Sequence, residues 1–228
     1  SYIGSSAGAM ITAYLAAGYS LENIFNSFLA KEPTHPSDST PKALPKISYS
    51  QMLRLRSGLA KDQVKQLLDL RHLISSVAKG DFQSLLEFKW FKMNGFFTTA
   101  GIEEYLREQV LPSNRFEDFI ADLLIVGTQL NHSRKMVFGR YSYLSPTKDP
   151  TCEYSNQVAV SEACAASMAL PFIYSPYSIR VGEREHDFID GEVRDTLSTH
   201  VAIDSGADLV IASYTHQPYH YTKEIGSL

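Results

Sequence analysis

Cysteine is scarce in this sequence, which has two thiols, Cys152 and Cys164, in 228 residues. Two cysteines are too few for a disulfide framework, and their spacing fits no metal-ligand motif. The 21 lysines and arginines are outnumbered by 25 aspartates and glutamates, and a net charge of −4 gives no reason to expect a nucleic acid partner. No apolar run approaches the roughly 20 residues needed to cross a bilayer, and no signal sequence opens the chain. These absences argue against a disulfide scaffold, a cysteine metal site, a nucleic-acid binder and a bilayer-spanning segment within residues 1–228.

The composition is that of a globular protein, with 44% apolar and 20% charged residues. A chain of this length suits one domain with a substantial core. We therefore take residues 1–228 as a single domain and look within it for groups that carry chemistry.

A G-x-S-x-G motif, Gly4-Ser5-Ser6-Ala7-Gly8, stands near the start of the chain. Such a motif holds a serine on a sharp turn between a strand and a helix, and Gly4 and Gly8 supply room for that turn. The small apolar residues that follow predict a helix from Ser6 to Gly18. Its N-terminus would favour an oxyanion, with the Ala7 backbone N–H as the expected donor. The other interpretation is a glycine-serine turn that merely starts a helix.

A strand must lead into such a turn, and only residues 1–3 precede Gly4. The apolar run 208–214 predicts a buried strand, yet only a polar tail follows it. We therefore expect the chain to be a piece of a longer protein, truncated at both ends.

The segment 31–112 predicts a linker followed by a helical insertion or cap. Residues 31–47 carry four prolines among serines and threonines, which is typical of a loop. Residues 49–112 show helical periodicity, and Pro112 would end the last helix. The insertion also holds an aromatic cluster, for which core packing is favoured over an acyl site or lipid contact. Its members are Phe88, Trp90, Phe91, Phe96 and Phe97.

The remaining segments alternate between helical and strand periodicity. They predict an α/β fold, a three-layer α/β/α sandwich with a mostly parallel central sheet. A hairpin would deliver Asp190 at the end of a strand, followed by Gly191. The predicted helices are 21–31, 158–168 and 196–205, and the predicted strands are 122–128, 135–139, 177–181, 186–189 and 208–214.

Four ordered motifs resemble those of the patatin-like phospholipases. The resemblance spans almost the whole chain except the insertion, and the Ala-Ser-x-Ala-Leu-Pro block is more specific than the serine motif. The motifs are Gly4-Ser5-Ser6-Ala7-Gly8-Ala9, Ala166-Ser167-Met168-Ala169-Leu170-Pro171-Phe172, Asp187-Phe188-Ile189-Asp190-Gly191 and Gly206-Ala207-Asp208-Leu209-Val210-Ile211.

The resemblance implies a serine acyl hydrolase with a Ser-Asp dyad, in which Ser6 is the nucleophile and Asp190 the general base. Gly191 would let the backbone turn away sharply. The implied substrate is a lipid acyl ester, and the sequence does not choose among phospholipid, lysophospholipid and triacylglycerol. The dyad needs no metal or organic cofactor. Where the family usually has another small residue this chain has Glu192, which either raises the pKa of Asp190 or faces solvent.

The family's glycine-rich oxyanion loop, which lies upstream of the serine motif, has no counterpart in residues 1–228. Loss of such donors costs about 100- to 1000-fold in rate each. We therefore expect residues 1–228 alone to have little activity. A cytoplasmic or peripheral-membrane location, with peripheral membrane contact, is the expectation for such an enzyme, and the oligomeric state stays open.

Two alternatives compete with the dyad. A Ser-His-Asp triad would use His200, His216 or His220, but these lie in a predicted amphipathic helix and a polar tail, which suit surface histidines. A non-catalytic patatin-like protein would instead bind lipid or a partner through the aromatic-rich insertion.

Overall fold

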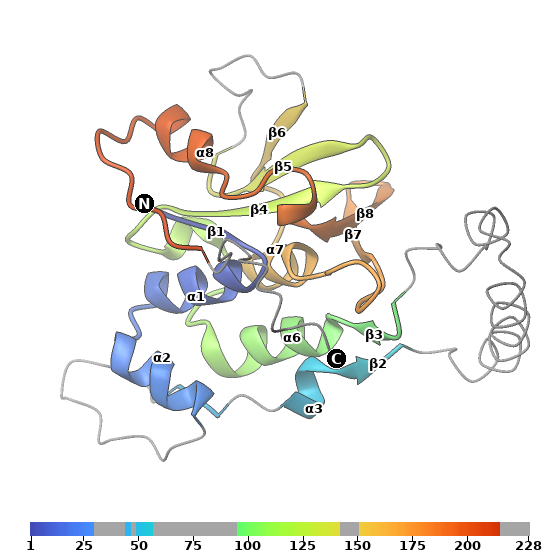
Figure 1. Ribbon diagram of the computed structural model, residues 1–228, viewed down its shortest axis with the longest axis horizontal. Helices are drawn as coiled ribbons and strands as arrows, with labels where there is room; N and C mark the ends of the chain where they lie inside the picture. The colour runs from blue at the N-terminus through green and yellow to red at the C-terminus, as the bar shows by residue number, and fades with distance from the viewer. Residues whose placement is uncertain (30–43, 47–48, 57–94, 142–150, 215–228) are drawn as a thin grey trace, which may run out of the picture.

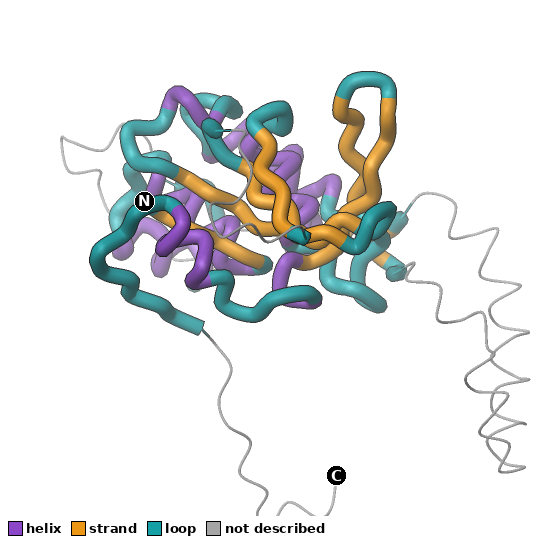
Figure 2. The backbone as a smooth tube through the Cα atoms, turned by 90° about the horizontal axis from the view of Figure 1, so that it is seen from above, coloured by secondary structure: helices purple, strands orange, loops and turns teal. Residues whose placement is uncertain are grey.

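The computed structural model describes residues 1–29, 44–46, 49–56, 95–141 and 151–214, and statements about the structure refer to these ranges. Figure 1 shows a central sheet with helices on both sides, and Figure 2 shows the strands grouped together with helices beside them. This is the α/β/α sandwich that the sequence predicts. The sheet contains β1 (Tyr2–Ser5), β4 (Leu123–Gln129), β5 (Arg134–Phe138), β6 (Cys152–Ser155), β7 (Tyr177–Val181) and β8 (Arg184–Asp190).

The sheet is mixed, which corrects the expectation that its strands are mostly parallel. The pairs β1–β4 and β5–β6 are parallel, whereas β4–β5, β4–β8 and β7–β8 are antiparallel. For β4–β5 and β7–β8 the reason is the length of the connections. Residues 130–133 join β4 to β5, and residues 182–183 join β7 to β8, and links this short make hairpins because a parallel crossover needs a dozen residues or more.

The arrangement along β4 determines which residues meet. β1 pairs with the first half of β4, so that Ser5 lies opposite Val126. β8 pairs with the second half in the opposite direction, so that Asp190 lies opposite Gly127. The carboxyl ends of β1 and β8 therefore converge at two neighbouring residues of β4.

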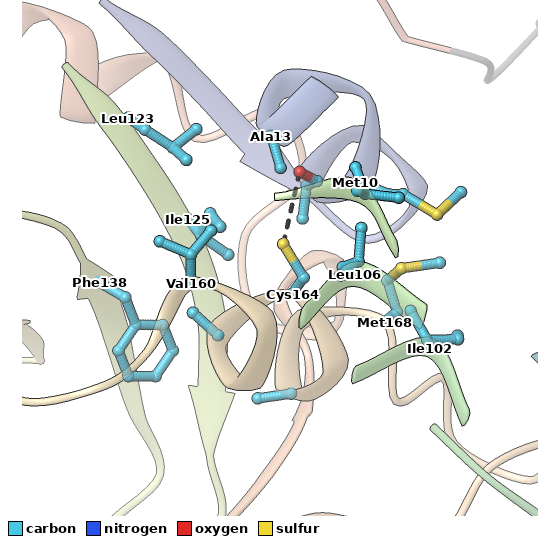
Figure 3. Packing of buried hydrophobic residues seen from close by; sticks show 14 of the residues in the cluster. Met10, Ala13, Ile102, Leu106, Leu123, Ile125, Phe138, Val160, Cys164 and Met168 are labelled. Carbon is cyan, nitrogen blue, oxygen red and sulfur yellow. Dashed lines mark hydrogen bonds between the residues drawn. The ribbon is translucent and has the colours of Figure 1, made fainter. Parts of the chain in front are cut away.

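One face of the sheet carries the larger core. Alternate side chains of β4, β5 and β8, among them Ile125, Phe138 and Phe188, pack on this face. It is covered by α1 (Ala7–Ala16), α6 (Ala100–Tyr105) and α7 (Val160–Ser167). Figure 3 shows the contact between α1 and α7, where the buried Cys164 thiol donates to the Ala9 carbonyl at 3.7 Å. Small residues on both helices permit this close approach.

The opposite face has a smaller core beneath α8 (Thr199–Asp204), where Val201 packs against Leu124, Val126 and Val137. The helix begins three residues later than predicted, because Leu197 adopts a left-handed backbone with φ 63°. The predicted strand 208–214 is wrong. Those residues form no strand pairing in the described part of the chain, and Leu209 and Ile211 are 78% and 88% exposed. An apolar run becomes a strand only where a neighbouring strand accepts its hydrogen bonds.

The other predicted helices that fall within the described residues occur close to their expected bounds. Ser20 caps α2 (Leu21–Phe28) by accepting a hydrogen bond from Asn23 N. The helix ending before Pro112 consists of α6 and a π-helical turn, Leu106–Val110, and its buried side chains belong to the main core. Short elements complete the fold: α3 (Tyr49–Met52), β2 (Arg54–Leu55), β3 (Phe97–Thr98) and the 3-10 turns Phe116–Asp118 and Gly191–Val193.

The ends of the predicted insertion are not wholly helical, since β2 and β3 form a two-stranded antiparallel sheet. Residues 30–43 and 57–94 lie outside the described residues, and with them most of the predicted linker, the helical stripe and Phe88, Trp90 and Phe91. The domain organisation therefore stays a prediction. Among the helices that are described, none is long and apolar enough to span a bilayer.

Candidate active site

Ser6 occupies the turn between β1 and α1. Its backbone has φ 54° and ψ −132°, a combination that residues other than glycine rarely adopt. Gly4 makes the turn possible, because a Cβ there would lie 2.6 Å from the Ala9 Cα. Gly8 has a different environment, since a Cβ there would meet no described atom within 4 Å. Steric crowding therefore accounts for Gly4 and not for Gly8.

The Ser6 hydroxyl donates a hydrogen bond of 2.5 Å to Oδ2 of Asp190, across 184 residues of sequence. The length is at the short end of the range for a hydroxyl bound to a carboxylate. The convergence of β1 and β8 on Val126 and Gly127 explains the contact. The fold thus places a strained serine and a carboxylate within reach of proton transfer.

Asp190 is fully buried. Its Oδ1 accepts the Glu192 backbone N–H at 2.9 Å, and its own N–H donates to the Ala169 carbonyl at 3.0 Å. Burial raises the pKa of Asp190 above its ordinary value, while the hydrogen bonds from Ser6 and from the Glu192 backbone oppose that rise. A carboxylate with a raised pKa is a stronger base than a free aspartate.

The family model for patatin-like phospholipases matches residues 1–203. The chain belongs to the patatin-like phospholipase family. No curated protein matches it in a sequence search. Members of this family are lipid acyl hydrolases, so the family places this chain among enzymes that act on lipid esters.

Gly191 is required in this patatin-like protein by a close approach between elements. A Cβ at Gly191 would lie 2.5 Å from the Ser5 hydroxyl and would also meet the Val126 carbonyl. The position after Asp190 therefore has no room for a side chain. The chain also turns here, since the 3-10 turn Gly191–Val193 follows β8 directly, so the close approach is a second reason for glycine at this position.

The sequence left open whether Glu192 raises the pKa of Asp190 or faces solvent, and in the structure it does each in part. It is half-buried, and its Oε2 accepts the Leu197 N–H at 3.4 Å. Its negative charge is the smallest of the causes that act on Asp190, and it raises the pKa of that carboxyl. Glu192 thus holds the turn that follows Asp190 and adds slightly to its basicity.

The first turn of α1 lies beside Ser6 and offers the expected oxyanion donor. α1 begins at Ala7, whose backbone N–H lacks an acceptor within the helix because the first four such groups of any helix do. Ala7 is exposed. The Ser6 N–H has another partner, since it donates to the Ser167 hydroxyl at 2.9 Å.

The contacts of His186 and His200 are with residues other than Ser6 and Asp190. His200 lies on α8, where its Nε2 is 3.0 Å from Lys135 Nζ and its Nδ1 is 3.2 Å from Asp195 Oδ2. His186 contacts Gln129 at 3.0 Å. His216 and His220 lie outside the described residues. In the part of the chain that is described, no group of three or more metal-ligating side chains could hold an ion.

Ser167 is the residue of the site that sequence reasoning missed. It is fully buried at the end of α7, and its hydroxyl donates to the Val126 carbonyl at 2.6 Å while accepting the Ser6 N–H. The Ala-Ser-x-Ala-Leu-Pro block contains Ser167, but a motif in one sequence does not say which hydrogen bonds its serine forms. Only the packing of α7 against β4 and the turn shows them.

Proposed function

We propose that this protein hydrolyses lipid acyl esters with Ser6 as nucleophile and Asp190 as general base. The observation that carries the proposal is the 2.5 Å hydrogen bond between the Ser6 hydroxyl and the fully buried Asp190 carboxylate. A base must lie within hydrogen-bond reach of the proton that it removes, and this one does.

In the proposed reaction the Ser6 oxygen attacks the ester carbonyl while its proton passes to Asp190. The C–O bond to the alcohol then breaks, and the leaving oxygen takes the proton from Asp190. A water molecule next attacks the acyl–Ser6 ester and gives one proton to Asp190. Collapse of that second intermediate releases the fatty acid and returns the proton to the Ser6 oxygen. The raised pKa of Asp190 favours each proton uptake.

Negative charge develops on the former carbonyl oxygen in both steps. We propose that the Ala7 N–H, at the positive end of α1, donates to that oxygen. The Ser6 N–H is committed to Ser167. Gly8 follows in the same turn, and its open surroundings leave space beside these N–H groups.

We further propose that the protein contacts the lipid surface peripherally, through exposed apolar residues on the loop that follows Ala169 and on the adjoining β2 and β3. Residues 170–173 follow Ala169, whose carbonyl accepts the Asp190 N–H. Phe97 N donates to Ile173 O, and Arg56 N donates to Phe96 O, so β2 and β3 are joined to this loop. We call the exposed members of this surface the apolar rim: Leu53, Leu55, Phe96, Leu170, Phe172 and Ile173.

Phe172 is the most unusual residue of the apolar rim. It is 59% exposed and has φ 72°, a left-handed backbone that is rare for a bulky residue. Replacement of Phe172 by aspartate is expected to weaken sedimentation with phosphatidylcholine vesicles several-fold. Ile120, which is fully exposed elsewhere, provides the control, because Ile120→Asp changes charge equally. Equal loss in both variants would contradict the membrane contact.

Hydrolysis is best measured in the full-length protein, so that any residues flanking 1–228 are retained. Release of fatty acid from phospholipid, lysophospholipid and triacylglycerol identifies the substrate class, which the family does not specify. Ser6→Ala and Asp190→Asn are each expected to abolish release without unfolding the protein. The expectation that residues 1–228 alone react slowly is tested by comparing the two lengths.

The second candidate is a patatin-like protein that binds lipid without hydrolysing it. The apolar rim favours this candidate as well, because such a surface serves binding whether or not chemistry follows. A fluorophosphonate probe separates the two. Vesicle binding without labelling of Ser6 supports the binding protein, and labelling with turnover supports the hydrolase.

A further inference from the structure

Ser167 forms hydrogen bonds that join three parts of the fold: α7, the turn that contains Ser6, and β4. It ends α7, its hydroxyl accepts the N–H of Ser6 in the turn, and the same hydroxyl donates to the carbonyl of Val126 in β4. Val126 lies opposite Ser5, and the next residue of β4 lies opposite Asp190. The chain of hydrogen bonds therefore ties the backbone of Ser6 to the point on β4 where the dyad converges.

The Ser167 hydroxyl does not form the hydrogen bond that is usual for a serine in a helix. Serines within helices commonly bond to a carbonyl of their own preceding turn. Ser27 of α2 does so with Ile24, and Ser205, the residue after α8, does so with Val201, each at 2.7 Å. Ser167 instead forms both of its hydrogen bonds with other elements. It is fully buried, and an unpaired hydroxyl there would lower the stability of the protein.

Ser6, which donates its N–H to the Ser167 hydroxyl, is the residue of the site with a strained backbone. A left-handed serine persists only where its surroundings fix the backbone. The hydrogen bond to the Ser167 oxygen fixes the direction of the Ser6 N–H bond. The orientation of this peptide unit in turn fixes the position of the Ser6 Cβ. The same hydrogen bond also gives the Ser6 N–H a partner within the protein, whereas the N–H of Ala7 has no acceptor within α1.

We propose that Ser167 is a positioning residue for the nucleophile, which holds the Ser6 backbone in its reactive conformation and withholds the Ser6 N–H from the oxyanion. The inference rests on the proposed function, since it assigns a role in the reaction of Ser6. Ser167 acts through Ser6 and touches no reacting atom.

The test compares two buried serines of the same helix. Ser161 is also fully buried on α7, and its hydroxyl bonds to Glu103 at 2.9 Å and to Asn114 at 2.8 Å, away from the dyad. Ser161→Ala and Ser167→Ala each remove a buried hydroxyl with two partners. The fall in melting temperature of Ser161→Ala therefore measures how much a buried, hydrogen-bonded serine of this helix contributes to stability alone.

Kinetics are then measured in the full-length protein on a soluble short-chain ester, well below both melting temperatures. We expect Ser167→Ala to lower kcat about 10- to 100-fold with KM changed less than about twofold, because displacement of a reacting group by about an ångström has costs of this size. The rate of Ser6 labelling by a fluorophosphonate should fall in parallel. Ser161→Ala should leave kcat and labelling within about twofold.

A second variant, Ser167→Cys, keeps a weaker donor and acceptor of similar shape and is expected to give a kcat between wild type and Ser167→Ala. If Ser167→Ala does not fold, the Cys variant alone must lower kcat more than Ser161→Ala does. A kcat within twofold of wild type in the folded Ser167 variants, or an equal loss in Ser161→Ala, overturns the inference. Turnover that survives Ser6→Ala overturns the proposed function and this inference with it, whereas loss in Ser6→Ala but not in the Ser167 variants overturns this inference alone.

Discussion

Two regions of the molecule contain a serine hydroxyl bonded to an aspartate at the same distance. Ser6 donates to Asp190 at 2.5 Å across 184 residues, and Ser113 donates to Asp118 at 2.5 Å across five. The first pair joins the turn after β1 to the end of β8, where Asp190 is fully buried and Ser6 is partly buried. The second lies at the surface, where it closes the short 3-10 turn Phe116–Asp118. Distance therefore does not distinguish them.

The surroundings do distinguish them. Asp190 is fully buried, and burial raises its pKa, whereas Asp118 is exposed and water competes for its oxygens. Ser6 has a left-handed backbone and stands at the N-terminus of a ten-residue helix. A reactive pair thus requires a dry base, a fixed nucleophile and a donor for the oxyanion, and the surface pair supplies a natural control for each.

The largest difference between the pairs is expected when the serines are removed. Ser6→Ala should lower kcat by about 10⁴-fold or more, because loss of a nucleophile leaves only binding and oxyanion stabilisation. Ser113→Ala should leave kcat within about twofold. Steady-state hydrolysis of a lipid ester measures both, and similar losses in the two variants would erase the distinction.

Replacing the acids is the next largest test. Asp190→Asn should lower kcat about 10³- to 10⁴-fold, because an amide cannot take the Ser6 proton. It should not lower the melting temperature at neutral pH, because burial disfavours the charged carboxylate that the amide replaces. Asp118→Asn is the matched control and should change kcat by less than about twofold. A melting temperature that falls sharply in Asp190→Asn would mean that this carboxylate is needed for folding.

The pH dependence sharpens the comparison further. Asp190 must be ionised to act as a base, so kcat/KM should fall as pH is lowered through an apparent pKa above the ordinary aspartate value of 3.8. Stability should respond with the opposite sign. A carboxyl whose pKa is raised by folding binds protons more tightly in the folded state, so its contribution to stability grows as pH falls from above the raised pKa towards 3.8.

Rate profiles of the wild type, with unfolding of wild type and Asp190→Asn followed over the same pH range, check both signs. An acid limb at or below the ordinary aspartate value would contradict the buried base. So would a difference in stability between the two proteins that does not change with pH.

The smallest expected effects concern the glycines near Ser6. Gly191→Ala should lower the free energy of unfolding by about 1–3 kcal/mol, because the new methyl would overlap Ser5 and Val126. Gly8→Ala should raise it by up to about 0.5–1 kcal/mol, since alanine favours the helix and the site is open. Denaturant unfolding measures both. Equal destabilisation would show that the space at Gly8 is already filled.

The nucleophile half of the site could be predicted from the sequence because its determinants are local. Gly4, Ser6 and the apolar run to Gly18 lie within one strand, one turn and one helix, and each restricts the backbone by itself. For Asp190, the sequence pattern predicts only that it ends a strand and precedes a glycine. Which residue it faces depends on two strands sharing one edge of β4, and no periodicity shows that.

Other features depended on partners that a single sequence does not reveal. Ser167 reads as one more small residue in a small-residue helix until α7 is packed against β4. The segment 208–214 has the composition of a strand but no described strand beside it. Two of the three antiparallel strand pairs follow from short connections, and the third, β4–β8, joins strands far apart in the sequence.

The central claim is that Asp190 makes Ser6 reactive, and covalent labelling tests it most directly. Full-length wild type and Asp190→Asn are treated with a fluorophosphonate, digested, and mapped by mass spectrometry. We predict one adduct, on Ser6, with a labelling rate at least about 100-fold lower in Asp190→Asn. An adduct on Ser113 or another serine in place of Ser6, or equal labelling of Ser6 in both proteins, would contradict the account.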